Sequence, residues 1–320
     1  MLVCALDIGG SSVKSGVVEV NGDGAYLLDA TQSSPLVSRQ FENLRSVDMD
    51  SIAGRLNEHP EISALGISTT GSVNRSGVVV SAGHFDDYRE VSWSEVLAPI
   101  FPTLEHVETV NDGRASAWAE YTALDGRTMS QINAVIGTGV GGGIVDNGVL
   151  LLGDGGQAGY IGHIKVTAEP TVRCSCGSTG CVEVLAAAPA IVRYWQEAAG
   201  ISDDAENHSF SDVTAAAQLG EESALSAFRR AGRWLGVGLG NAMNVLNPSV
   251  VSVGGGVLLA SGSVSSAPAG GPYFEAVAEG LAWAAHWRIV ASADLRLARF
   301  GNDAGLLGAA QLAAQTAQGA

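Results

Sequence analysis

Short apolar runs alternate with longer segments of helical periodicity along the chain, and this alternation is typical of an α/β protein. The apolar runs have strand length and are bounded by glycine or polar residues. The predicted strands are Leu2–Ile8, Gly16–Val20, Leu65–Ser68, Ala134–Thr138 and Ser249–Val253. The predicted helices are Gly113–Leu124, Val184–Ala199, Ser223–Leu246 and Gly305–Gln315. The Gly-, Ser- and Pro-rich stretch Ser261–Pro272 is expected to be a flexible surface loop.

Two parts of the chain share one local pattern of strand, glycine turn, second strand and Asn-Gly ending. The first copy runs from Ile8 to Gly22 and the second from Gly137 to Gly148. A real duplication implies two similar halves that share a ligand between them. Chance similarity between two hairpins explains the pattern equally well, so the sequence leaves both interpretations open.

Composition narrows the class of protein. The 320 residues carry a net charge of −16, whereas binding to nucleic acid or to an anionic membrane needs a basic face. Hydrophobic residues make up 46% of the chain, which is too many for a disordered protein. There is no run of about 18 apolar residues to span a bilayer, and Met1–Leu6 lacks the basic flank of a signal peptide. We therefore expect a cytoplasmic protein of roughly two domains, with no nucleic-acid or membrane partner.

Three glycine turns follow predicted strands. Asp7 ends the first strand and is followed by Gly9 and Gly10, whose backbone N–H groups can approach an anion closely. Gly137–Gly143 offers a second turn of this kind, and Gly254–Gly256 follows a third strand. A plain hairpin explains any one of these turns. Three together favour phosphate binding, although no helix follows the GxGxxG spacing of the second turn, which disfavours a dinucleotide-binding fold.

Asn111-Asp112 lies where a strand is expected to pass into a helix. Capping of that helix is the better interpretation of a lone aspartate in this place. A catalytic role competes with it only if the glycine turns face the same cleft.

Cysteines gather in one short segment. His163, Cys174, Cys176 and Cys181 have the number and chemistry of a closed tetrahedral zinc site. Gly177 and Gly180 supply the tight turns that such a loop needs. A disulfide is disfavoured in a reducing compartment, and thiols without metal are the remaining alternative. Cys4, in the first predicted strand, is interpreted as a small core residue.

These residues, in this order, resemble the ROK family (repressors, open reading frames and kinases) of the actin/hexokinase/Hsp70 superfamily. The resemblance extends from about residue 5 to about residue 312. It implies two RNase-H-like α/β domains with the active site in the cleft between them. Residues 1–115, joined by a closing helix at 302–320, are expected to form one domain. Residues 116–301, with the zinc loop at 163–181, are expected to form the other.

The resemblance also implies a reaction, the transfer of the ATP γ-phosphoryl group to a sugar hydroxyl, with Asp112 as catalytic base. Asp7 would hold Mg²⁺, and a structural Zn²⁺ would be bound by His163 and the three clustered cysteines. ATP would be bound by Asp7, Gly9, Gly10, Ser11, Lys14, Gly137, Thr138, Gly139, Gly254, Gly255 and Gly256. The sugar would be bound by Gly71, Asn111, Asp112, Tyr160, His163 and Glu183. Lys14 is equally well interpreted as a solvated strand residue, and Glu183 as a carboxylate that complements a helix dipole. Family members are commonly dimers, so a homodimer is expected.

Two other function classes compete with a kinase. ROK repressors carry a DNA-binding domain before the first glycine turn, and here that turn begins within ten residues of Met1. A sugar-binding module without catalysis is expected to lose the catalytic aspartate, and Asp112 is present. The sequence therefore favours the enzyme.

One position departs from the family pattern. ROK sugar kinases usually have Glu-x-Gly-His before the zinc loop, whereas this chain has Tyr160-Ile161-Gly162-His163. A tyrosine cannot accept hydrogen bonds from two hydroxyls as a carboxylate does. Either Tyr160 packs at the edge of a glucokinase cleft, or the substrate differs from glucose. An amino-hexose such as kanosamine (3-amino-3-deoxyglucose) is then a candidate.

Overall fold

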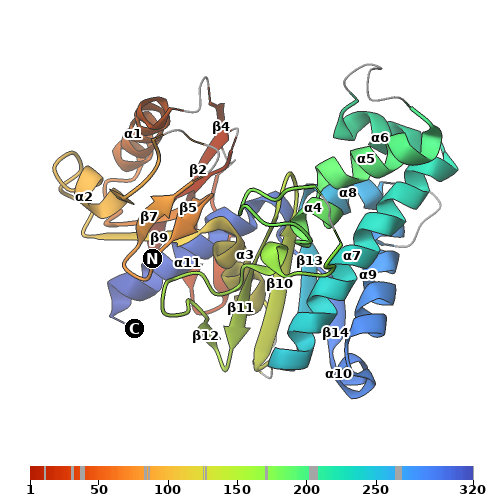
Figure 1. Ribbon diagram of the computed structural model, residues 1–320. Helices are drawn as coiled ribbons and strands as arrows, with labels where there is room; N and C mark the ends of the chain where they lie inside the picture. Colours follow the sequence, from red (N-terminus) through yellow and green to blue (C-terminus); the bar gives the residue numbers. More distant parts are fainter. Residues whose placement is uncertain are drawn as a thin grey trace.

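The structure is a computed structural model. It describes residues 1–10, 12–29, 32–36, 40–82, 85, 87–124, 126, 128–169, 172–201, 208–263 and 269–319. In this part the chain forms two lobes, each built on its own sheet (Figure 1). Ser11, predicted to contact phosphate, lies outside the described residues, as does the middle of the predicted loop at 261–272.

The first sheet has the strand order β3-β2-β1-β5-β9, with β4 paired to β2. β1 is antiparallel to β2 and parallel to β5, which is in turn parallel to β9. The strands are β1 (Leu2–Ile8), β2 (Ser12–Asn21), β3 (Gly24–Leu27), β4 (Gln32–Pro35), β5 (Ala64–Thr69) and β9 (His106–Asn111). The predicted strands at Leu2–Ile8, Gly16–Val20 and Leu65–Ser68 are confirmed, and the second of these is longer than expected because pairing with β1 extends to Val13.

The second sheet repeats this arrangement with the order β12-β11-β10-β13-β14. β10 is antiparallel to β11 and parallel to β13, and β13 is parallel to β14. The strands are β10 (Ser130–Ile136), β11 (Val140–Asp146), β12 (Val149–Leu150), β13 (Val250–Gly254) and β14 (Asp294–Leu297). The same order and directions in both sheets confirm the duplication and the α/β class.

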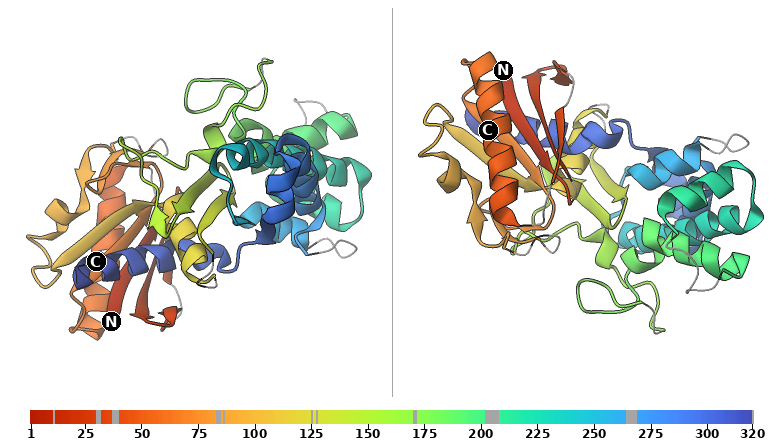
Figure 2. Two further views of the ribbon diagram at one scale, coloured as in Figure 1. Left: turned by 90° about the horizontal axis from the view of Figure 1, so that it is seen from below. Right: turned by 90° about the horizontal axis from the view of Figure 1, so that it is seen from above.

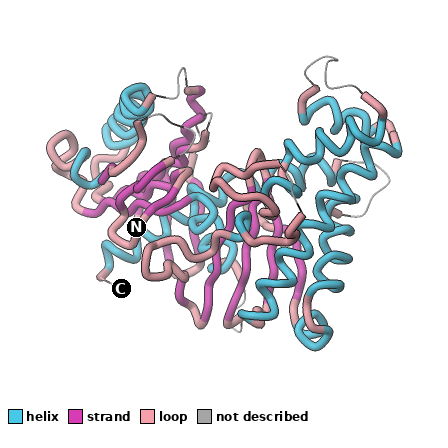
Figure 3. Tube along the Cα trace, viewed as in Figure 1, coloured by secondary structure: helices cyan, strands magenta, loops and turns pink. Residues whose placement is uncertain are grey.

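Helices cover the side of the second sheet that faces away from the first lobe (Figure 3). They are α4 (Glu183–Ala186), α5 (Ala188–Ala199), α6 (Phe210–Gln218), α7 (Glu222–Leu246), α8 (Gly256–Gly262), α9 (Gly271–Ala284) and α10 (Trp287–Ser292). The continuous helix predicted at Val184–Ala199 is wrong, because the chain is extended at Ala187, between α4 and α5, and Pro189 lies in the first turn of α5. The predicted loop at Ser261–Pro272 is also too long, since Gly271 and Pro272 are buried in the first turn of α9.

Two helices lie between the sheets. α3 (Asp112–Thr122) follows the first sheet but packs on β10 and β11 of the second. α11 (Ala304–Gln318), after the short helix η2 (Gly301–Asp303), packs on β1, β5 and β9 of the first sheet and against α3. Figure 2 shows α11, in blue, running beside the first sheet so that the two termini lie close together. α3 thus follows the last strand of the first sheet but packs on the second, and α11 follows the last strand of the second sheet but packs on the first.

Small residues allow these layers to come together. A side chain at Gly66 would lie 2.3 Å from the Ala309 carbonyl oxygen, and one at Gly308 would lie 1.8 Å from that of Ala115. Alternation along β1 places Val3 and Ala5 in the core cluster under α11, and Cys4 and Leu6 in the cluster on the opposite side. Asp7 continues the row under α11, at the carboxyl end of the strand.

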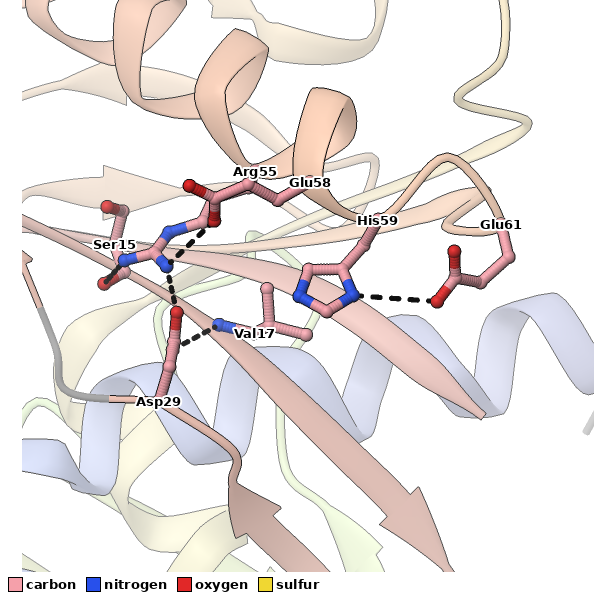
Figure 4. A network of polar contacts seen from close by, with 7 residues as sticks. All are labelled: Ser15, Val17, Asp29, Arg55, Glu58, His59 and Glu61. Carbon is pink, nitrogen blue, oxygen red and sulfur yellow. Dashed lines mark hydrogen bonds and ion pairs between the residues drawn. The ribbon is translucent and has the colours of Figure 1, made fainter.

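The other face of the first sheet is covered by α1 (Phe41–Glu58), which a buried ion pair fixes in place (Figure 4). Arg55 is 3% exposed and pairs with Asp29, while its Nη2 donates to the Ser15 carbonyl. Asp29 also accepts a hydrogen bond from the Val17 backbone N–H. Because both charges have partners, the pair ties α1 to β2 rather than leaving an isolated buried cation.

A small sheet of β6 (Ser72–Val73), β7 (Val78–Ser81) and β8 (Val91–Ser92), followed by α2 (Trp93–Leu97), lies between β5 and β9 in sequence. The Tyr88 hydroxyl receives a hydrogen bond from Trp93 Nε1 at 2.7 Å and lies 2.9 Å from Thr69 Oγ1. This buried polar contact anchors the insertion to the end of β5. In the described part of the chain, none of the helices combines the length and apolarity needed to cross a membrane.

Gly308→Ala tests the close packing of α3 and α11. The new methyl group would meet backbone on the facing helix, so we expect a loss of at least about 2 kcal/mol of stability in urea denaturation. Gly54→Ala is the matched control, since a Cβ there in α1 meets nothing within 4 Å. It should be neutral or gain up to about 1 kcal/mol. Equal stabilities of the two variants would contradict the packing described.

Candidate active site

The carboxyl ends of parallel strands from both sheets carry the predicted site residues, and α/β folds bind ligands at such ends. Asp7 is on β1, and Asn111 ends β9. In the second sheet, β10 ends at Ile136 just before the second glycine turn, and β13 ends at Gly254. The duplicated topology therefore brings the three glycine turns and both aspartates to one region between the lobes.

Asp7 lies in a shell of polar groups. Ser68 Oγ, from the neighbouring strand, donates to Asp7 Oδ1 at 2.7 Å, and Lys14 Nζ lies 3.9 Å from Oδ2. Burial raises the pKa of Asp7, an effect opposed by Ser68 and Lys14 and reinforced by the charge of Asp303. A side chain at Gly305 would lie 2.8 Å from Oδ1, so this glycine makes room for the carboxylate under α11.

Asp112 begins α3, and both of its described hydrogen bonds reach the same oxygen. Asn111 Nδ2 and the Gly113 backbone N–H donate to Asp112 Oδ1 at 2.9 and 2.7 Å. Capping of the helix falls instead to Asn111, whose side chain accepts from the Arg114 N–H at 3.3 Å. Burial and then the negative charge of Asp7 raise the pKa of Asp112 to about 6. The sequence alone favoured Asp112 as the cap, and that interpretation is wrong.

Arg114 is a site residue that the sequence analysis missed. It is 2% exposed, and its Nη2 donates to the Val73 carbonyl at 2.7 Å. Its Nε is buried without a hydrogen-bond partner among the described residues. Burial lowers the pKa of Arg114, while the nearby Tyr160 and Asp112 oppose that effect. Its place two residues after Asp112, on the helix that enters the cleft, is the signal that identifies it.

Gly71 and Tyr160 approach this region from the two lobes. The Gly71 carbonyl accepts from Asn111 Nδ2 at 2.9 Å, and its φ of +96° favours glycine. The Tyr160 ring lies edge-on to that of His163, with centroids 5.7 Å apart. Direct contacts therefore join Gly71, Asn111 and Asp112 in one group of predicted sugar residues, and Tyr160 and His163 in another.

The second glycine turn is held by Glu183. The Val140 N–H donates to Glu183 Oε2 at 3.1 Å, and a side chain at Gly139 would lie 2.7 Å from that oxygen. The Ala188 N–H donates to the Gly137 carbonyl at 3.0 Å, so the start of α5 fixes the other side of the turn. β11, not a helix, follows the turn, as the sequence predicts.

A shallow pocket of 360 Å³ opens beside this turn. Thr138 lines it together with apolar groups of Ala188, Pro189, Val192 and Phe210. Arg193, Gln196 and His208 add polar atoms. The third glycine group is packed close by against β10, since a side chain at Gly255 would lie 2.4 Å from the Ile136 carbonyl oxygen. A pocket lined by apolar side chains and a few polar groups suits a heterocycle.

His163 and the three clustered cysteines come together. Their ligand atoms all lie within 4.8 Å of one another, with His163 Nδ1 3.5 Å from Cys174 Sγ and Cys176 Sγ 3.5 Å from Cys181 Sγ. Tetrahedral zinc with bonds of about 2.0–2.3 Å needs ligand atoms roughly 3.5–3.8 Å apart. The residues therefore fit Zn²⁺, and the close thiols are not joined as a disulfide.

Both lysines of the chain lie at these sites, whereas the other 15 of its 17 Lys and Arg residues are arginines. Lys14 Nζ donates to the Asn302 carbonyl at 2.7 Å in addition to facing Asp7. Lys165 Nζ donates to Cys181 Sγ at 2.8 Å. A cation beside a three-thiolate metal site offsets its excess negative charge.

Known proteins are similar to this chain over nearly its whole length. The model of the ROK family matches residues 3–316. The chain is 32% identical over 328 residues to a glucokinase of Streptomyces coelicolor, covering 98% of this chain and 97% of that one. It is 31% identical over 319 residues to an N-acetylmannosamine kinase of Shigella flexneri, covering 98% of each chain.

One solved structure is also similar to this chain over nearly its whole length. It is a ROK family glucokinase from Streptomyces griseus in complex with glucose and AMPPNP. The two structures agree with a TM-score of 0.80 at 30% identity, over 98% of this chain and 100% of that one. This similarity agrees with the α/β architecture of two RNase-H-like domains.

The cysteine cluster generates a direct prediction. Protein purified without added metal is expected to contain one zinc per chain by elemental analysis, because three thiolates and an imidazole form a closed zinc site. Cys176→Ala should retain much less zinc. Cys4→Ala should retain it all, since Cys4 lies in the core of the first lobe. Metal-free wild-type protein, or the same zinc content in both variants, would show that the cluster is not a metal site.

Proposed function

The chain belongs to the ROK family, and we propose that it is a kinase that transfers the γ-phosphoryl group of ATP to O6 of a hexose or amino-hexose. The observation that carries the proposal is the carboxylate of Asp112, with a pKa raised to about 6. It lies next to Asp7 and between glycine turns from both lobes. A sugar-binding protein without catalysis has no need of such a half-buried pair of carboxylates.

Asp112 is the proposed general base. Asn111 and Gly113 hold its Oδ1, and no described residue donates to Oδ2, which leaves that oxygen for the sugar hydroxyl. A pKa of about 6 leaves the carboxylate ionised at neutral pH and makes it a stronger base than an ordinary aspartate. Asn111 and Gly113 thereby fix the direction from which the hydroxyl proton is accepted.

Asp7 and the glycine turns are proposed to bind the nucleotide phosphates. Mg²⁺, when bound, offsets the negative charge of the phosphates. Asp7 is placed to hold it, because Ser68 and Lys14 orient its carboxylate. Backbone N–H groups at Gly10, Thr138 and Gly139 would contact phosphate oxygens, whereas the Gly9 N–H donates to the Ser12 carbonyl at 2.9 Å and shapes the first turn. The adenosine would lie between Gly254–Gly256 and the pocket beside Thr138.

The sugar is proposed to lie between Gly71, Asn111 and Asp112 on one side and Tyr160, His163 and Glu183 on the other. His163 directs Nδ1 at the cysteine cluster, which leaves Nε2 for a sugar hydroxyl. Tyr160 stands where the family usually has a glutamate, and it cannot accept hydrogen bonds from two hydroxyls as a carboxylate does. Glucose and an amino-hexose such as kanosamine are therefore both proposed as acceptors.

We also propose that residues 1–115 with 302–320 form one domain and residues 116–301 the other. We further propose that the protein is a homodimer and is located in the cytoplasm. Sedimentation of the purified protein measures the oligomeric state directly. No observation on the structure favours a sugar-responsive regulator.

Asp112→Asn tests the catalytic assignment. We expect kcat to fall at least about a hundredfold, because a general base contributes roughly 10²–10⁴. The same variant should be about 2 kcal/mol more stable than the wild type at pH 8. A raised pKa means that the folded state disfavours the ionised carboxylate, so this gain should vanish near pH 4, where Asp112 is protonated. Thermal denaturation at both pH values and steady-state kinetics measure the two effects. Near-normal turnover would refute the assignment.

A coupled assay of ADP release tests the substrate class, with glucose, N-acetylmannosamine, glucosamine and kanosamine as acceptors. We expect at least one amino sugar to have a higher kcat/KM than glucose, because Tyr160 cannot accept from two hydroxyls as the family glutamate does. Tyr160→Glu should raise kcat/KM for glucose relative to the other sugars, since a carboxylate accepts from two hydroxyls. Tyr160→Phe, which removes only the hydroxyl, is the control. An unchanged ranking in Tyr160→Glu would show that Tyr160 does not set specificity, and no turnover of any sugar would count against the kinase.

A further inference from the structure

One carboxylate joins the metal-binding loop to the second glycine turn. Glu183 opens α4, and its two oxygens face opposite ways. Oε2 accepts from the Val140 N–H at 3.1 Å, on the turn. Oε1 lies 3.4 Å from Ser175 Oγ and 3.5 Å from Cys174 Sγ, on the loop. Glu183 is thus a bridge between a ligand of the proposed metal site and a backbone group of the proposed phosphate site.

The turn side of this bridge is tight. A Cβ at Gly139 would lie 2.7 Å from Glu183 Oε2, so glycine is needed for the carboxylate to sit against the turn. The turn has one internal hydrogen bond, from the Gly137 N–H to the Gly139 carbonyl at 2.9 Å. Its other described anchors outside the strands are Glu183 and the Ala188 N–H. Glu183 is therefore one of the anchors that orient the N–H groups of the turn.

The loop side depends on the cysteine cluster. The Cys174 N–H bonds to the Ser178 carbonyl and the Gly177 N–H to the Cys174 carbonyl, so these contacts remain within the loop. Cys174 is connected to the rest of the lobe through His163 and Glu183. A bound metal would fix Cys174 to His163 and Cys181, and would thereby fix the adjacent Ser175 hydroxyl against Glu183.

We propose that Glu183 couples the metal loop to the phosphate turn, so that metal occupancy raises the affinity for nucleotide even when no sugar is present. The inference rests on the proposed function, since it assumes that nucleotide phosphates bind the turn. It assigns Glu183 a positioning role that is separate from any contact with the sugar. A hydrogen bond to a charged group is strong enough for an effect of about fivefold or more in binding.

The test is a thermodynamic cycle measured without sugar, so that a sugar-binding role of Glu183 has no influence. The dissociation constant of Mg-AMPPNP is measured by calorimetry for the wild type and Glu183→Ala, each zinc-loaded and zinc-stripped. Stripping should weaken binding about fivefold in the wild type and less than twofold in Glu183→Ala. Equal losses in the two proteins, or no loss in either, would overturn the inference.

Two serines of the same loop supply a matched control. Ser175→Ala removes the hydroxyl that contacts Glu183 and should weaken zinc-loaded binding by about threefold. Ser178→Ala removes a hydroxyl of the same loop that has no described hydrogen bond, and should leave binding unchanged. The same affinity in both variants would count against the bridge.

Reciprocity gives a second readout that does not need the stripped protein to stay folded. If zinc strengthens nucleotide binding, the nucleotide must strengthen zinc binding by the same factor. Mg-AMPPNP should therefore lower the zinc dissociation constant, measured by equilibrium competition with a chromogenic chelator, in the wild type and in Ser178→Ala, but not in Glu183→Ala. A zinc affinity of the wild type that does not change with the nucleotide contradicts the coupling. An absence of nucleotide binding in every protein would instead show that the proposed function is wrong.

Discussion

The close packing of α3 against α11, between the two sheets, is the constraint on which the site depends. Backbone meets backbone where Gly308 lies on Ala115 and where Gly66 lies under Ala309. Any larger residue at these positions would push the sheets apart. Because Asp7 ends a strand under α11 and Asp112 begins α3, the spacing of these layers also sets the spacing of the two carboxylates. Small residues in the core thus determine how far apart the two carboxylates of the site lie.

Burial and the negative charge of Asp7 raise the proton affinity of Asp112, and the surrounding groups limit this effect. Lys14 and Ser68 face Asp7, while Asn111 and the Gly113 N–H bind Asp112. The balance leaves Asp112 with a pKa of about 6, well above its ordinary value but still below neutrality. A site that holds a charged base in a partly buried position destabilises the folded state, and the fold tolerates this because function needs it.

Local patterns in the sequence predicted the parts of the fold that depend on local physics. The strand at Leu2–Ile8 and the long helix near Ser223–Leu246 were predicted because apolar periodicity is strong there. The break at Ala187 and the early start of α9 at Gly271 were not, because tertiary packing overrides composition at both places. Spacing also identified the cysteine cluster. It did not identify Arg114, whose burial and hydrogen bond to the Val73 carbonyl involve a segment distant in sequence.

The two halves share one topology but differ in what is inserted into it, and the insertions meet over the site. The segment after β5 carries β6 to β8, and the segment after β12 carries Tyr160 and the metal loop. A side chain at Gly156 would lie 2.5 Å from Asn74 Cα, and Gln157 Nε2 donates to Ser72 Oγ at 3.3 Å. The glycine turns and aspartates, by contrast, belong to the duplicated sheets or directly follow their strands. Under the proposed function, phosphoryl transfer therefore belongs to the duplicated core, whereas the choice of sugar would depend on the contact between the insertions and could change without altering that core.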